Sequence, residues 1–150
     1  MTDKFAAEGD AEVSFHIGIV GYADRKFDTE RALCLLNEIF AEIKRGYGGK
    51  EVVIVSGATM CGIHKLLYPM AAGLGYRTEG VMCSKGYEWS LYPVDELFVV
   101  GDSWGEESDF FTDRIDVLYR IGGGKQSLKE CQLAKSKGKK TIEYELEELV

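Results

Sequence analysis

The sequence has no excess of positive charge and no long hydrophobic run. Its formal net charge is −7 and its isoelectric point is about 4.9. Non-specific binding to a nucleic-acid duplex needs a basic face, so this charge argues against it, although backbone N–H groups can still hold a small anion. The hydrophobic stretches are too short to span a bilayer, and no N-terminal segment joins a basic start to an apolar core. We therefore expect neither a membrane span nor a signal peptide.

Closely spaced cysteines are also missing. The four cysteines are Cys34, Cys61, Cys83 and Cys131. None forms a C-x-x-C pair, so their spacing does not suggest a disulfide framework, and a reducing, cytoplasmic location is expected. The segment "CGIH" gives Cys61 and His64 a metal-like spacing, but two ligands do not make a site. We expect no metal, with Cys61 as a small loop residue and His64 on a helix surface.

Short hydrophobic runs alternate with helical patterns along the 150 residues. Runs at 13–21, 51–57, 96–101 and 116–121 lack the polar alternation of half-exposed strands, which predicts central, buried parallel strands. The segments "YRTEGVMC" and "KTIEYEL" indicate two further strands, the first of them weaker. This order predicts an α/β fold: a three-layer, Rossmann-like, doubly wound and mostly parallel sheet with helices on both faces. We expect a flexible N-terminus over 1–12 and a single domain over 13–150.

Four of the predicted strands end in glycine: Gly21, Gly57, Gly101 and Gly122. In doubly wound sheets, ligands bind beyond the carboxyl ends of the strands, where the strand order reverses. Two of the loops lead directly into helices, whose unpaired N–H groups and positive dipole ends favour anions. The loops therefore predict a crevice for a phosphate-bearing ligand. The first loop, "GYADRK", lacks G-x-G-x-x-G, which argues against a classical NAD dehydrogenase.

The segment "RIGGGKQSLKE" at residues 120–130 has two compatible interpretations. Ser127 and Glu130 fit a capping box at the start of a helix, with the three glycines Gly122–Gly124 forming only a tight turn. Alternatively, an anion rests on the exposed N–H groups of this turn. A capping box needs at most one turn glycine, and glycine lets a ligand approach the backbone. We therefore favour a ligand-binding role.

The loop "DSWGEES" carries acidic residues and a tryptophan. Asp102, Glu106 and Glu107 could supply a carboxylate nucleophile or general acid for glycosyl transfer. The simpler interpretation, which we favour, is that Asp102 or Ser103 starts a helix and the two glutamates occupy its first turn. Trp104 could stack on a base or lie in a dimer contact.

Two segments, "VSGATMCGIHKLLYPMAAGLGYRTEGV" and "DVLYRIGGGKQSLKE", resemble the Rossmann-like LOG/SLOG superfamily. This superfamily includes the lysine-decarboxylase-like proteins and the cytokinin-activating phosphoribohydrolases. Its motif P-G-G-x-G-T-x-x-E aligns here with Gly122 for the proline, Gly123 and Gly124 for the paired glycines, Gln126 for the later glycine, Ser127 for the threonine and Glu130 for the glutamate. "SGATMCGI" resembles the second family loop, and "VGYADRKF" the first.

The resemblance implies a nucleotide-like ligand and a homodimer or larger assembly. In the phosphoribohydrolase branch, the motif glutamate works with an arginine of the preceding helix, which implies Glu130 and, more weakly, Arg114 as catalytic residues. The aromatic residues Trp89 and Tyr92 also suggest a homo-oligomer contact. We predict a nucleotide-binding protein without a further cofactor, a nucleic-acid partner or a membrane partner; the alternatives are an N-glycosidic hydrolase or transferase acting on nucleoside monophosphates, and an oligomeric structural protein. The predicted ligand-binding residues are Gly21, Arg25, Ser56, Gly57, Thr59, Gly62, Asp102, Gly122, Gly123, Gly124, Gln126 and Ser127.

Overall fold

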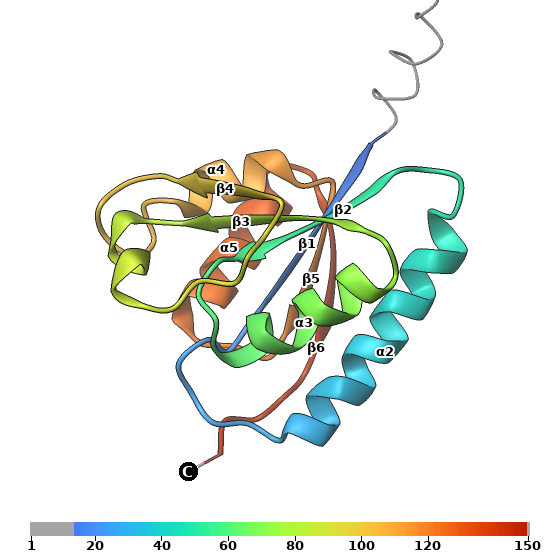
Figure 1. Ribbon diagram of the computed structural model, residues 1–150, viewed down its shortest axis with the longest axis horizontal. Coiled ribbons are helices and arrows are strands. Elements are labelled where there is room, and N and C mark those ends of the chain that lie inside the picture. Colours follow the sequence, from blue (N-terminus) through green and yellow to red (C-terminus); the bar gives the residue numbers. More distant parts are fainter. Residues whose placement is uncertain (1–13, 150) are drawn as a thin grey trace, which may run out of the picture.

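The computed structural model describes residues 14–149, so the segment 1–12, for which flexibility was expected, lies outside the described residues. Six strands and five helices follow one another along the described chain (Figure 1). They are β1 (Phe15–Gly21), α2 (Thr29–Gly46), β2 (Val52–Gly57), α3 (Gly62–Gly73), β3 (Arg77–Met82), the short 3₁₀ helix η1 (Ser84–Glu88), β4 (Glu96–Val99), α4 (Ser108–Arg114), β5 (Val117–Ile121), α5 (Lys125–Ser136) and β6 (Lys140–Tyr144).

The strands form one six-stranded sheet in the order β4-β3-β2-β1-β5-β6. All neighbouring strands in this sheet are parallel. The chain moves outward from β1 to β4, then returns to the other side of β1 to form β5 and β6. The order therefore reverses between β1 and β5, which is where such sheets place their ligands. The predicted Rossmann-like, three-layer α/β fold is confirmed.

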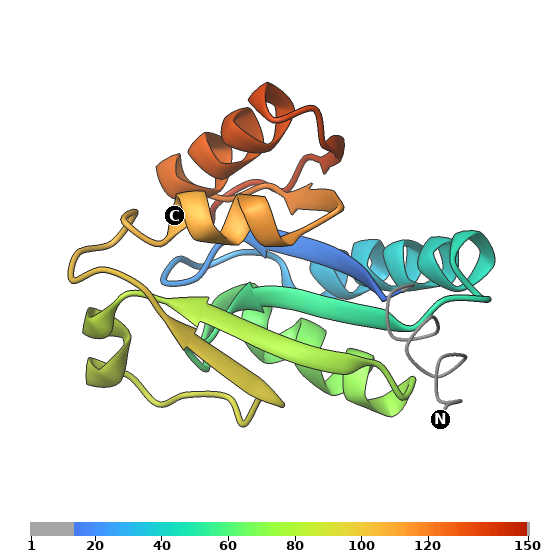
Figure 2. The same ribbon diagram turned by 90° about the horizontal axis from the view of Figure 1, so that it is seen from above.

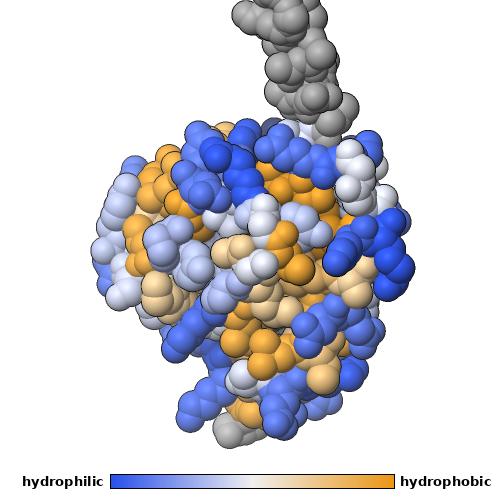
Figure 3. Space-filling view, turned by 45° about the vertical axis from the view of Figure 1, so that its right-hand side comes forward, coloured by the Kyte–Doolittle hydropathy of each residue, from blue (hydrophilic) through white to orange (hydrophobic). Residues whose placement is uncertain are grey.

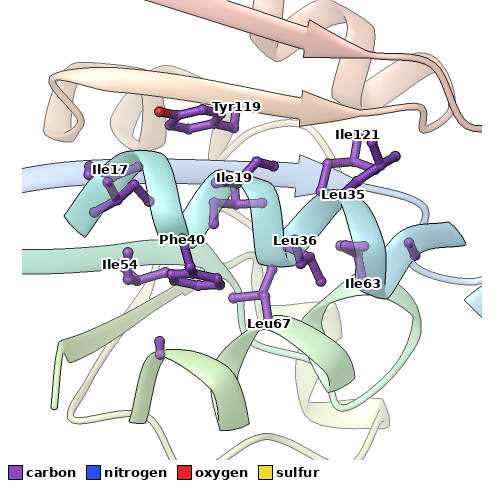
Figure 4. Packing of buried hydrophobic residues seen from close by; sticks show 14 of the residues in the cluster. Ile17, Ile19, Leu35, Leu36, Phe40, Ile54, Ile63, Leu67, Tyr119 and Ile121 are labelled. Carbon is purple, nitrogen blue, oxygen red and sulfur yellow. The ribbon is translucent and has the colours of Figure 1, made fainter. Parts of the chain in front are cut away.

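Helices cover both faces of the sheet. Figure 2 shows α4 and α5 on one face and α2 and α3 on the other. Side chains of α2, among them Leu36 and Phe40, pack against β1 and α3, as Figure 4 shows. On the opposite face, Phe111 and Ile115 belong to a second buried cluster with valines of β1, β2 and β3. Two apolar layers thus fix β1 and β5 in the centre of the molecule.

Helix α2 begins where the sequence supplies a cap. The Asp28 side chain accepts a hydrogen bond from the Arg31 N–H at 3.1 Å. This satisfies one of the N–H groups that a helix start leaves unpaired. The cap marks the end of the loop after β1, at the carboxyl edge of the sheet.

The prediction for strands three and four was wrong in one respect. The segment 96–101 was expected to be central and buried, but β4 is an edge strand, and Leu97 and Val99 are exposed. The weaker-looking β3 lies inside the sheet, and five of its six residues are buried. The polar residues of β3 made it look like a weaker strand, but Glu79 is buried in an ion pair with Arg114.

The molecular surface is mixed in character. On the face drawn in Figure 3, hydrophobic residues lie among hydrophilic ones. Within residues 14–149, no helix combines the length and the hydrophobicity that a membrane crossing requires.

Candidate functional site

A cavity of about 340 Å³ opens at the carboxyl edge of the sheet, beside the β1–β5 reversal point. This volume falls in the range of roughly 300–1,000 Å³ that is usual for small-molecule sites. Its walls come from the loops after β1, β2 and β4 and from the start of α5. The cavity therefore lies at the place that the strand-end glycines predicted.

Most of the predicted ligand-binding residues line this cavity, together with Glu130. Those that line it are Gly21, Arg25, Gly57, Thr59, Gly124, Gln126 and Ser127. The remaining five, Ser56, Gly62, Asp102, Gly122 and Gly123, are not among the lining residues. Ser56 is fully buried and donates a hydrogen bond to the Ile19 carbonyl oxygen at 2.5 Å, so it links β2 to β1.

The glycine triplet divides into two parts. Gly122 and Gly123 have φ angles of +56° and +98°, which favour glycine. A Cβ at Gly122 would overlap the Leu146 carbonyl oxygen, and one at Gly123 would lie 2.6 Å from the Cβ of Ser127. Gly124 differs: its φ is −94°, and an added Cβ would meet no atom within 4 Å. Two glycines therefore make the turn, while the third leaves open space at the cavity wall.

The predicted capping box does not form. Helix α5 begins at Lys125, with Gly124 as its N-cap and no side-chain cap. Ser127 therefore lies inside the first turn, and its Oγ donates to the Gly21 carbonyl oxygen at 3.0 Å. The Glu130 carboxylate accepts hydrogen bonds from Ser108 and Gln126 instead, so the first N–H groups of α5 have no side-chain cap.

Two helix N-termini border the cavity. The first residue before α3, Cys61, and the first turn of α5 both line it, and neither helix has a side-chain cap. Each of these helices has 12 residues, so each presents a positive dipole end there. Lys125 and Arg25 add positive charge, although the Arg25 guanidinium also pairs with Glu148 at 3.1 Å. This part of the wall suits an anionic group.

Two carboxylates, those of Glu107 and Glu130, form another part of the wall, and the Gln126 amide bridges them. Gln126 Nε2 donates to Glu107 Oε2 at 2.9 Å and to Glu130 Oε2 at 3.2 Å. Ser108 Oγ also donates to Glu130 Oε2, at 2.8 Å. Burial raises the pKa of Glu130 to about 7, against the lowering effect of these hydrogen bonds. At neutral pH, Glu130 can therefore donate or accept a proton.

His64 is a wall residue that the sequence analysis placed on a helix surface, and that prediction was wrong. The side chain is 8% exposed and lines the cavity. Its Nδ1 lies 3.0 Å from the Thr59 carbonyl oxygen and 3.3 Å from Thr59 Oγ1. Burial lowers the pKa of His64 to about 4, and the Thr59 hydrogen bond offsets only part of this. His64 is thus neutral near pH 7. Gly57 makes room for its ring, because a Cβ there would overlap it.

Both tryptophans of the chain line the cavity. Trp89 follows η1 and Trp104 lies in the loop after β4, and they are 40% and 46% exposed. Apolar side chains, including Val81, Met82 and Phe111, complete the wall. Flat apolar surfaces of this kind suit an aromatic ring.

Two of the acidic side chains in the loop "DSWGEES" hydrogen-bond to nearby groups and not to the cavity. Glu106 Oε1 accepts the N–H groups of Asp102 and Ser103, and Asp102 Oδ1 accepts a hydrogen bond from Ser84. Of the three acidic residues considered in the sequence, only Glu107 lines the cavity. The favoured prediction, a helix starting at Asp102 or Ser103 with both glutamates in its first turn, was wrong, because α4 begins only at Ser108 and Glu107 is its N-cap residue.

Arg114 is outside the cavity lining. Its guanidinium makes two hydrogen bonds to the Glu79 carboxylate, at 2.5 and 2.8 Å. It also stacks over the Phe98 ring, 4.5 Å from the centroid. Arg114 is thus occupied in holding β3 to α4. Within residues 14–149, no group of three or more His, Cys, Asp or Glu side chains is placed to hold a metal ion.

No protein-family model matches the chain, and neither does any curated protein sequence. Solved structures do match. The molybdenum cofactor carrier protein MCP from Chlamydomonas reinhardtii shares 22% identity at a TM-score of 0.69, over 87% of this chain and 76% of that one. The molybdenum cofactor binding protein from Rippkaea orientalis shares 21% at 0.65, over 88% and 76%. The X-ray structure of TM1055, a structural genomics target, shares 18% at 0.68, over 85% and 72%. At these identities, the likeness establishes that the chain has their Rossmann-like fold.

Proposed function

We propose that this protein binds a nucleotide or a nucleotide-like small molecule in the cavity at the carboxyl edge of the sheet. The observation that carries the proposal is the pairing of two features in one cavity. An uncapped helix N-terminus with an unobstructed glycine, Gly124, lies on one part of the wall, and both tryptophans lie on another. The first suits a phosphate and the second suits a heteroaromatic ring.

The structural neighbours support a binding role. Two of them are described as a carrier of, and a binding protein for, the molybdenum cofactor. A carrier or sensor needs a cavity and a ligand, and it needs no reaction. The predicted loops of the LOG/SLOG superfamily also meet at this cavity, through Gly21, Gly57 and Gly124.

Tryptophan fluorescence gives a direct test, because the chain has two tryptophans and both line the cavity. We expect nucleoside monophosphates to quench or shift this emission in a saturable way, while ribose 5-phosphate and free bases act more weakly. Mass spectrometry of the supernatant after denaturation should reveal any ligand that copurifies. If neither nucleotides nor a copurified small molecule bind, the proposal is wrong.

The variant Gly124→Val tests the place of binding. Its side chain would extend into open space at the first turn of α5, so the fold should persist while the phosphate loses its approach. Gly49→Val is the matched control, because a Cβ at Gly49 also meets no atom within 4 Å and Gly49 is not among the lining residues. We expect at least a tenfold loss of affinity in Gly124→Val alone. Equal affinities in the two variants would place the ligand elsewhere.

A second candidate function is N-glycosidic cleavage of a nucleoside monophosphate. One observation favours it: the cavity holds a carboxyl group, Glu130, whose pKa is raised to about 7, as a general acid for a leaving base requires. Arg114 is not available as its partner, but Arg25 shares the cavity. Cleavage would also need the developing positive charge on the sugar to be stabilised, which Glu107 could do from the same wall.

Incubation with a panel of nucleoside monophosphates separates binding from cleavage. Chromatography would detect free base and ribose 5-phosphate. Release that disappears in Glu130→Gln, with nucleotide binding retained, would favour the enzyme. We expect slow release or none.

Assembly as a homodimer or larger oligomer remains a prediction. Tyr92, which suggested it, stacks on Tyr68 with ring centroids 5.0 Å apart, and Trp89 lines the cavity. Both aromatic residues therefore have a place within one chain. Light scattering at micromolar concentration would decide, and a sharp monomer mass would contradict the prediction.

A further inference from the structure

His64 lies in the cavity wall, and its ring nitrogen Nε2 has no hydrogen-bond partner among the described residues. Its other nitrogen, Nδ1, is committed to Thr59: a carbonyl oxygen can only accept, so Nδ1 carries the proton. A neutral imidazole has one N–H. Nε2 is therefore left with a lone pair and can only accept a hydrogen bond.

The position of Nε2 follows from two facts. Within residues 14–149, no fully buried side-chain nitrogen or oxygen lacks a hydrogen-bond partner. Both hydrogen bonds of the His64 ring use Nδ1, and His64 takes part in no ion pair with another described residue. Nε2 therefore has no polar partner among the described residues. Nε2 must therefore touch accessible space, and for a side chain that is 8% exposed and lines the cavity, that space is the cavity.

We infer that His64 selects the ligand by accepting a hydrogen bond from an N–H group on the edge of its heteroaromatic ring. This inference rests on the proposed nucleotide-like ligand. It adds that the ring edge facing His64 carries a hydrogen-bond donor. The ring would lie against the tryptophans and the apolar wall, with its donor edge toward α3 and its phosphate toward the start of α5. An amino-bearing purine presents such a donor, whereas a purine without one would leave the buried acceptor unpaired.

Glu130 places a second oxygen without a described partner on the same wall. Glu130 Oε2 receives the hydrogen bonds from Ser108 and Gln126, and Oε1 has no partner among the described residues. By the same reasoning, Oε1 faces accessible space, and Glu130 lines the cavity. When Glu130 is ionised, Oε1 is a second acceptor beside His64 and favours a ring edge that carries donors. When Glu130 is protonated, Oε1 is a donor, and His64 alone sets this polarity.

The test compares pairs of nucleotides that differ by one exocyclic amine. AMP is paired with purine riboside 5′-monophosphate, and 2-aminopurine riboside 5′-monophosphate is paired with the same amine-free nucleotide. Tryptophan fluorescence or calorimetry gives each affinity. We expect the amine to improve binding at least about tenfold in one pair, because a buried acceptor left unpaired is costly.

His64→Leu should reduce this preference to less than about threefold, chiefly because the amine-bearing nucleotide binds more weakly to the variant. His64→Gln places a carbonyl oxygen near the position of Nε2 and should restore part of the preference, which a merely structural role would not explain. If His64→Leu fails to fold, ¹⁵N NMR of wild-type histidines provides the readout, since the chain has only His16 and His64. The amine-bearing nucleotide should shift the Nε2 resonance of His64, and its partner should not.

The outcomes separate the inference from the proposed function. If nucleotides bind but neither pair is discriminated, or the preference survives in His64→Leu, the inference fails and nucleotide binding stands. An Nε2 resonance that responds equally to both members of a pair would also overturn it. If no nucleotide binds at all, both the proposed function and the inference fall.

Discussion

Ser127 Oγ donates a hydrogen bond to the carbonyl oxygen of Gly21, across 106 positions of sequence. This contact joins the first turn of α5, the helix that follows β5, to the end of β1, and so bridges the strand-order reversal between β1 and β5. It therefore ties together two walls of the cavity.

Removing this contact should loosen the cavity more than it unfolds the protein. Ser127→Ala leaves the Gly21 carbonyl without its partner, and we expect a loss of about 1 kcal/mol in the free energy of unfolding. Urea denaturation measures it. Ser136→Ala is the control, because the exposed Ser136 hydroxyl bonds only to Leu133 within its own helix, and its effect should stay within about 0.5 kcal/mol. Equal losses would show that the contact across the reversal point has no special role.

The glycines of the triplet should respond differently to alanine. Gly123→Ala forces a side chain onto a φ of +98° and against Ser127, so we expect a loss of about 2 kcal/mol or more. Gly124→Ala meets no atom and has an ordinary φ, and its stability should stay within about 0.5 kcal/mol of wild type. Thermal unfolding of the two variants side by side checks this. The reverse order of stabilities would mean that the turn is built differently.

The ion pair of Glu79 with Arg114 should matter for stability and not for ligand binding. Although burial raises the pKa of Glu79, the hydrogen bonds from Arg114 and the nearby His16 side chain, 3.8 Å away, hold it at about 2. Arg114→Met leaves the carboxylate buried without its main partner. A fully buried pair would lose about 3–5 kcal/mol, but this guanidinium is 31% exposed, so we expect about 2 kcal/mol.

The double variant Glu79→Met/Arg114→Met serves as the control, since it removes the stranded charge as well. It should recover part of the loss in urea denaturation. Nucleotide affinity should be unchanged in the soluble folded fraction of each variant, because neither residue lines the cavity. A selective loss of binding in Arg114→Met would return this arginine to the site.

Glu130 should make the protein less stable as the pH rises. Its pKa is about 7 in the folded chain against an ordinary value of 4.5, so the folded state holds the proton more tightly. Between pH 4.5 and 7 the folded state then binds more protons, and the free energy of unfolding falls with rising pH. Glu130→Gln removes this dependence. We expect the variant to gain about 2 to 3 kcal/mol relative to wild type between pH 5 and pH 8.

Urea denaturation of both proteins at the two pH values gives the difference directly. His64 has the opposite dependence, because its pKa of about 4 lies below the ordinary 6.5, but it is present in both proteins and cancels. Glu147→Gln, at an exposed position, is the matched control and should show no such change. A Glu130→Gln effect that is equal at pH 5 and pH 8 would contradict the buried, protonated state.

The sequence predicted the fold well because strand runs and helix periods are local signals. It predicted the place of the cavity because parallel strands end at one edge, where Gly21 and Gly57 lie. It failed where a distant contact decided the outcome. Ser127 matched a capping box with Glu130, but the helix begins two residues earlier than Ser127 and the hydroxyl reaches β1 instead.

His64 was missed for the same kind of reason. His64 was expected at the helix surface because Cys61 and His64 alone do not make a metal site, and nothing in "CGIH" shows that Thr59 of the preceding loop contacts the histidine ring. The signal that could have found it is Gly57, seven positions earlier, whose missing side chain makes room for the imidazole. Likewise, β3 was predicted as a weaker strand because the partner of Glu79, Arg114, lies 35 positions away in the sequence.

The central position of β1 has a consequence for synthesis on the ribosome. β1 pairs with β2, which follows it closely in the chain, and on its other edge with β5, whose residues lie about a hundred positions later. Until β5 has been made, β1 is an edge strand, and the wall formed by α5 does not exist. Such distant pairings slow folding. The cavity is therefore complete only after the start of α5 has been made, about a hundred positions after β1.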